Sequence, residues 1–127
     1  MNLQRVWWSI GVVLVAAAIL ICLMPVEDVA RVHWSDKISH LIGHGTLALY
    51  FAGLVPRRAW WKIFVFLLLI GVAIEFAQHF MSVGREGDPR DVLANSIGAL
   101  LGLALGRLGA ARWPELAAWL LGRRATQ

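Results

Sequence analysis

Charged residues are scarce in this chain, and their scarcity limits the class of protein it can be. Lysine, arginine, aspartate and glutamate make up 16% of the 127 residues, whereas 59% are hydrophobic. Water-soluble domains carry about 25% charged residues. We therefore expect an integral membrane protein. Its net charge of +4 is then explained by topology, so no nucleic-acid partner is expected.

Cysteine and familiar catalytic motifs are also nearly absent. Cys22 is the one cysteine, so no disulfide can form within the chain, and the redox compartment stays open. The sequence contains no nucleophile-elbow serine motif and no phosphate-binding glycine loop. Any enzymatic interpretation therefore lacks a named mechanism.

Apolar runs divide the chain into four candidate helices. They cover about residues 7–24, 38–55, 61–81 and 92–108. At a rise of about 1.5 Å per residue, such runs can cross a hydrocarbon core of about 30 Å, the shortest with local thinning of the bilayer. Pro25, Gly84, Gly87 and Pro89 stand in the breaks. We predict an all-α polytopic membrane protein, a four-transmembrane-helix bundle that forms a single domain over residues 1–127.

The basic residues predict an orientation. Arg5, the cluster within residues 57–62 and the arginines near the C-terminus all fall on one side of a four-span arrangement. That side is expected to be cytoplasmic, which places both termini in the cytoplasm. A short helix at about residues 113–122, with Pro114 suited to its first turn, is expected to lie in the membrane interface. The alternative is a frayed continuation of the fourth span.

Glycines recur at every fourth position of the fourth candidate span. Gly98, Gly102 and Gly106 share one helix face. Small residues on one stripe let a second helix approach closely inside a membrane. We expect this face to pack within the bundle, and a homodimer through the same face is a further possibility.

Polar side chains enter the apolar runs near their predicted outer ends. A charged side chain in hydrocarbon costs roughly 2.5 to 3.5 kcal/mol, so Glu75 is expected to face the bundle interior. Counted from the outer boundary, His40, Glu75 and Asn95 fall at similar depths. We predict an outward-facing polar pocket with His40 and Glu75 at its centre, and with these ligand-binding residues around them: Asp36, Lys37, Gln78, Arg85, Asp91 and Asn95.

Three ordered motifs resemble those of the VanZ-like membrane proteins. Asp36, Lys37 and His40 in "DKISH" match the start of the family's second helix, and "EFAQ" matches its third with Glu75 and Gln78. The segment "GREGDPRDVLANSIGALLG" matches the approach to the fourth helix through these residues: Gly84, Arg85, Asp91, Asn95, Gly98 and Gly102. The resemblance covers most of the chain. His44 departs from it, because the family usually has tyrosine or phenylalanine there.

The resemblance implies a bacterial cell-envelope protein of the cytoplasmic membrane. Such proteins are associated with reduced susceptibility to teicoplanin, a lipid-tailed glycopeptide. The resemblance supplies no reaction, so the biochemical function has to be argued from the polar residues.

Three functions fit these residues. The favoured one is recognition of an envelope lipid, a lipid-linked precursor or the lipid tail of an amphiphile, with Lys37, Arg85 and Arg90 contacting phosphate or carboxylate. A second is a membrane enzyme for phosphoryl-ester hydrolysis or transfer, with His40 and Glu75 as catalytic residues. A third is purely structural, with polar side chains joining helices through hydrogen bonds of about 0.6 to 2 kcal/mol each.

No metal or other cofactor is expected from the sequence. His40, His44, Glu75 and His79 offer atoms that zinc accepts. However, no helix carries a His-Glu-x-x-His arrangement, and the family pattern retains only His40 and Glu75. A transporter is disfavoured because the chain shows no inverted repeat.

Overall fold

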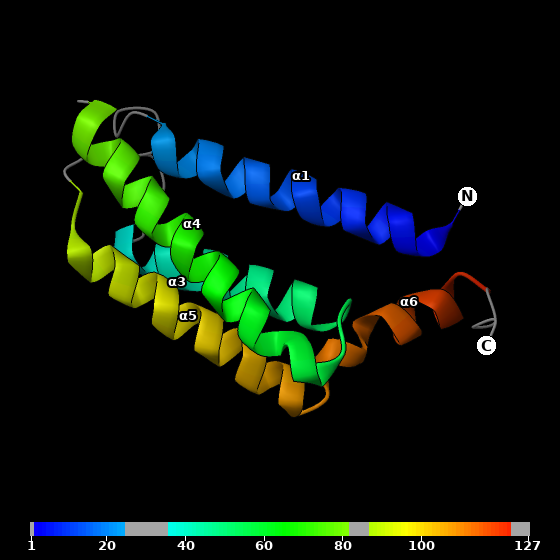
Figure 1. Ribbon diagram of the computed structural model, residues 1–127. Helices are drawn as coiled ribbons and strands as arrows, with labels where there is room; N and C mark the ends of the chain where they lie inside the picture. The colour runs from blue at the N-terminus through cyan, green and yellow to red at the C-terminus, as the bar shows by residue number, and fades with distance from the viewer. Residues whose placement is uncertain (1, 25–35, 82–86, 123–127) are drawn as a thin grey trace.

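The computed structural model describes residues 2–24, 36–81 and 87–122, and these ranges are helical (Figure 1). The long helices are α1 (Leu3–Leu23), α3 (Asp36–Ala52), α4 (Trp60–Met81) and α5 (Pro89–Arg107), and a short helix, α6 (Trp113–Leu120), follows them. Two 3-10 helices, η1 (Arg57–Ala59) and η2 (Ala110–Arg112), precede α4 and α6. No strand occurs in the described ranges, which confirms the all-α prediction.

Two helices start earlier than the sequence predicts, and a capping side chain explains each difference. α1 begins at Leu3 because the side chain of Asn2 accepts a hydrogen bond from the backbone N–H of Gln4 at 3.0 Å. α5 begins at Pro89, three residues before the expected residue 92, because Asp88 caps it and proline fits the first turn. The capping side chains therefore lengthen both helices toward the N-terminus.

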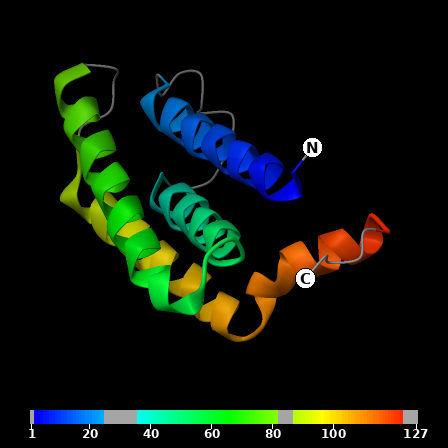
Figure 2. The same ribbon diagram turned by 45° about the vertical axis from the view of Figure 1, so that its right-hand side comes forward.

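Successive long helices run in opposite directions. At one end of the bundle, Gln78 of α4 donates through Nε2 to the carbonyl oxygen of Cys22 in α1 at 2.7 Å. At the other end, Arg57 of η1 donates to the carbonyl oxygen of Arg107 in α5 at 3.5 Å. Both Figure 1 and Figure 2 show the start of α1 and the whole of α6 on the same side of the bundle.

The core lies where α3, α4 and α5 meet. Its buried residues are Leu47, Ala48, Phe51, Ala52, Trp60, Ile63, Leu67 and Ala99. α3 and α5 pack most closely, because glycines of α5 lie against the backbone of α3: a Cβ added at Gly98 would overlap the carbonyl oxygen of Leu41, and one at Gly102 would overlap that of Gly45. The glycine face is thus covered by α3 within one chain.

α1 packs more loosely than the other long helices. Gly11 is its one buried residue, whereas Val12 is 65% exposed and Leu20 is 66% exposed. The hydroxyl group of Tyr50 ties α3 to α1 by donating to the carbonyl oxygen of Trp7 at 2.7 Å. An exterior this rich in large apolar side chains suits lipid better than water.

Only part of the four-span prediction is supported. α1, with 21 residues, and the segment Arg57–Met81, with 25, are long and apolar enough to cross a membrane. A third crossing is obtained if α5 and the η2–α6 segment count as one span, although they bend by 73° where they join. α3 has 17 residues, which corresponds to about 26 Å, and it carries Lys37, His40 and His44. Four spans therefore stay a prediction.

Candidate functional site

Three helices bring ionisable side chains together at one end of the bundle. His40 comes from α3, Glu75 from α4 and Asp91 from the first turn of α5. One nitrogen or carboxylate oxygen of each lies within 4.8 Å of the corresponding atoms of the other two. The residues are 3%, 8% and 3% exposed, respectively. We refer to His40, Glu75 and Asp91 as the buried triad.

The orientation of His40 is set by a neighbour on α5. Nδ1 of His40 lies 3.1 Å from Oδ1 of Asn95, which is completely buried. An amide oxygen only accepts hydrogen bonds, so this contact is a hydrogen bond in the ring form that carries a proton on Nδ1. Nε2 of the same ring lies 3.8 Å from Oδ2 of Asp91. Asn95 therefore holds the ring with Nε2 toward Asp91.

Asp88 connects the start of α5 to both other helices of the site. Its backbone N–H donates to Oε2 of Glu75 at 2.8 Å, and its own carboxylate lies 3.1 Å from Nζ of Lys37. The same Nζ lies 3.4 Å from Asp91. The capping hydrogen bond from the N–H of Arg90, followed by the bond from Lys37, holds the pKa of Asp88 below its usual value. Asp88 was not among the site residues expected from the sequence, although aspartate directly before proline indicates a helix N-cap.

Two glycines make room for the site. A Cβ at Gly71 would lie 2.8 Å from Nδ2 of Asn95, and a Cβ at Gly87 would lie 2.7 Å from the carbonyl oxygen of Glu75. Both distances are shorter than an ordinary van der Waals contact, so a Cβ at either position would clash with its neighbour. Gly87 was interpreted from the sequence only as a chain breaker, and Gly71 was not selected, because a lone glycine lacks the four-residue repeat that indicates close helix packing in α5.

One predicted ligand-binding residue, Gln78, contacts a different helix, and two histidines whose place in the site the sequence left open are not members of the buried triad. Gln78 is 2% exposed but bonds to α1 and not to the buried triad. His44 is 4% exposed and lies one turn deeper on α3. His79 is exposed, with its ring against that of Phe80 at 5.1 Å. The side chain of Asp36 and the whole of Arg85 lie outside the described residues.

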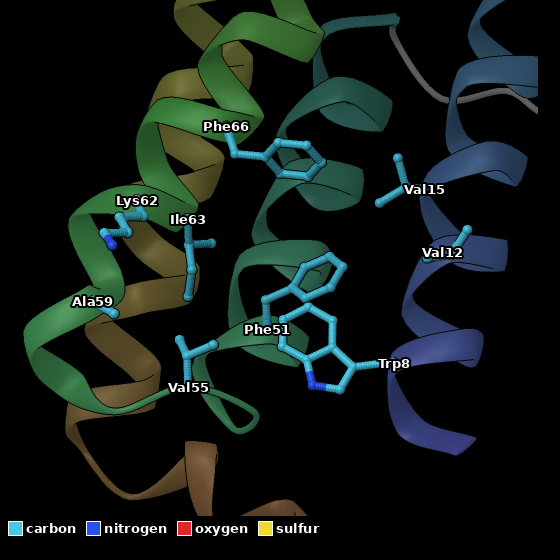
Figure 3. A pocket seen from close by; sticks show the side chains of 9 residues that line it. All are labelled: Trp8, Val12, Val15, Phe51, Val55, Ala59, Lys62, Ile63 and Phe66. Carbon is cyan, nitrogen blue, oxygen red and sulfur yellow. The ribbon is translucent and has the colours of Figure 1, made fainter. Parts of the chain in front are cut away.

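The structure shows a cavity in a different part of the molecule from the buried triad. Its volume is about 440 Å³, and it lies between α1, the end of α3 and the start of α4 (Figure 3). The lining is apolar except for Lys62: Trp8, Val12, Val15, Phe51, Val55, Ala59, Ile63 and Phe66. Phe66 and Glu75 are nine residues apart on α4, or about 13 Å along its axis. The members of the buried triad are almost fully buried, and an open pocket beside them stays a prediction.

The chemistry available at the triad follows from its atoms. Two carboxylates and an imidazole can accept protons, accept hydrogen bonds or bind a cation. The exposed half of Lys37 can meet a negatively charged group from outside the cluster. Burying ionisable side chains costs free energy, and ionisable residues inside membrane proteins therefore usually have a function.

Comparison with known proteins identifies the family of the chain. A family model described as VanZ/LLP1 matches residues 4–110, which include the four long helices that form the bundle and every member of the buried triad. No curated protein and no solved structure matches the chain. The family match covers well over half of the sequence and agrees with the motifs around His40, Glu75 and Asn95, so the chain belongs to the VanZ/LLP1 family.

Proposed function

We propose that this protein acts in the bacterial cytoplasmic membrane by recognising an envelope amphiphile: a lipid, a lipid-linked precursor or a lipid-tailed glycopeptide such as teicoplanin. The observation that carries this proposal is the position of Lys37. Its side chain is 50% exposed, yet it contacts Asp91, a member of the buried triad. A headgroup that meets Lys37 is therefore directly coupled to the buried carboxylates and His40.

The energetics favour a functional role for Glu75 over a purely structural one. A glutamine could join the helices through the same hydrogen bond from the N–H of Asp88 at lower cost, because it would bury no charge. The apolar exterior of α1 and α4 offers contacts for the acyl chain of the amphiphile. Lys37 supplies the cation that pairs with phosphate or carboxylate.

Glu75→Gln tests the proposal directly. Wild type and variant are expressed at equal membrane abundance in a Gram-positive host, and susceptibility to teicoplanin is measured, with vancomycin as the control glycopeptide. We expect wild type to protect against teicoplanin and Glu75→Gln to lose most of that protection, because the substitution removes a buried negative charge while preserving the shape of the side chain.

His79→Gln is the matched control, because His79 is an exposed residue one turn further along α4. It should protect as well as wild type. Equal protection by Glu75→Gln and wild type would make Glu75 a structural residue and remove the centre of the proposed site. If wild type gives no protection, teicoplanin is not an amphiphile that this protein recognises.

A further inference from the structure

We infer that the buried triad is a binding site for a divalent transition-metal ion, with His40, Glu75 and Asp91 as ligands. The inference goes beyond the proposed function and does not depend on it. Mutual distances below 4.8 Å are the first argument. Ligand atoms bound to one ion at about 2.0 to 2.2 Å in tetrahedral coordination lie about 3.3 to 3.6 Å apart, so binding would draw the more distant pairs together by about 1 Å. Nε2 of His40 and Oδ2 of Asp91 are already 3.8 Å apart.

The surroundings of the triad match those of metal ligands. A histidine that binds a metal usually donates its other ring N–H to an oxygen atom, and Nδ1 of His40 makes this bond with Oδ1 of Asn95. A carboxylate that binds a metal is usually hydrogen-bonded as well, and Oε2 of Glu75 accepts from the N–H of Asp88. His40 and Glu75 are therefore both oriented by neighbours outside the triad.

The charges of the described residues also favour a cation. Glu75, Asp88 and Asp91 bring three carboxylates to this end of the bundle, and Lys37 is the ammonium group in contact with two of them. A divalent ion between Glu75 and Asp91 would meet two carboxylates that are only 8% and 3% exposed.

The donor set selects the class of metal. One imidazole and two carboxylates suit zinc, manganese or iron better than calcium, which prefers six to eight oxygen ligands. Three protein ligands leave at least one coordination position open, as in zinc sites that bind water or substrate. The set differs from the four residues that the sequence offered, because Asp91 takes part while His44 and His79 lie elsewhere.

Zinc binding to the purified full-length protein tests the inference. The protein is prepared in detergent without a polyhistidine tag, dialysed against a chelator and then equilibrated with Zn²⁺, and bound metal is measured by elemental analysis. We expect one zinc per chain in wild type. Asp91→Asn and His40→Gln should weaken the affinity by at least about tenfold, since each removes a ligand.

Two matched variants distinguish the triad from other histidines. His44→Gln removes a buried histidine of α3, the helix that carries His40, and His79→Gln removes an exposed histidine of α4. Both should bind one zinc with wild-type affinity. The inference is overturned if wild type binds no stoichiometric zinc, or if His44→Gln and His79→Gln lose as much affinity as Asp91→Asn and His40→Gln. The wild-type stoichiometry decides the question even if a triad variant fails to fold, and the assay needs no lipid or antibiotic.

Discussion

At the scale of single residues, the short distance between α3 and α5 depends on two glycines of α5, because glycine has no side chain. The carbonyl oxygens of Leu41 and Gly45 occupy the places where Gly98 and Gly102 would carry a Cβ. Backbones this close gain dispersion contacts that lipid cannot replace, which is the usual source of helix association in membranes. The same approach brings His40 of α3 within reach of Asn95 and Asp91 of α5.

Gly98→Ala should therefore destabilise the bundle by about 1 to 3 kcal/mol, the usual cost of overpacking. The measurement is chemical unfolding of the purified protein in detergent micelles. Gly43→Ala is the control, because Gly43 lies in α3 with nothing within 4 Å of its added Cβ. It should be neutral or stabilising by up to about 1 kcal/mol, since alanine favours the helix. A Gly98→Ala protein as stable as Gly43→Ala would contradict the close α3–α5 contact.

At the scale of elements, one tryptophan attaches α6 to the bundle. Nε1 of Trp113 donates to the carbonyl oxygen of Tyr50 at 3.2 Å, and the two rings stack with centroids 4.8 Å apart. The ring of Trp7 meets the other side of Trp113 edge-on at 5.2 Å. Gly53 makes the space, because a Cβ there would overlap the indole nitrogen of Trp113. α6 thus contacts both α1 and α3 although none of its residues is fully buried.

Trp113→Ala should release α6 from the bundle. The substitution removes an aromatic stack and a hydrogen bond, and a loss of about 1.4 kcal/mol or more corresponds to at least tenfold more frequent opening. Limited trypsin digestion at Arg112 should accelerate by about that factor. Trp119→Ala serves as the control, because Trp119 is 74% exposed on the same helix. Equal digestion of the two variants would show that Trp113 does not hold α6.

At the scale of the whole molecule, both the apolar surface and the positions of the basic residues fit a protein that lies in a membrane. Large apolar side chains cover the outside of α1 and α4, and the buried triad lies at the end of the bundle away from the basic residues of η1. Basic residues favour the cytoplasmic side. The triad end is then expected to face outward, with both termini in the cytoplasm.

Cysteine labelling in intact cells checks this orientation. In a Cys22→Ala background, a cysteine introduced by Ser82→Cys should react with a membrane-impermeant thiol reagent. A cysteine introduced by Ala59→Cys in η1 should react only after the membrane is permeabilised. The opposite pattern would reverse the topology and place the triad on the cytoplasmic side, where an envelope amphiphile of the outer leaflet could not reach it.

The residues of the site show how far sequence reasoning extends. Glu75, His40 and Asn95 could be selected in advance, because polar groups in apolar helices are expensive and must face inward. Gln78 was assigned to the same site, but the structure turns it toward Cys22. The sequence did not identify Asp88 and Gly71 as residues of the site, because their roles depend on which helix lies opposite them.

The sequence by itself determined the all-helical class and the approximate helix ranges, because these follow from hydropathy and chain breakers. Its three ordered motifs also indicated the family that the family model then matched. The tertiary structure alone decided which of the residues expected around His40 and Glu75 approaches them: Asp91 comes within 4.8 Å of both, whereas Gln78 bonds to α1. The physical reason is helix rotation. The direction in which a side chain faces depends on packing, here on the glycine contacts between α5 and α3, and no local pattern specifies it.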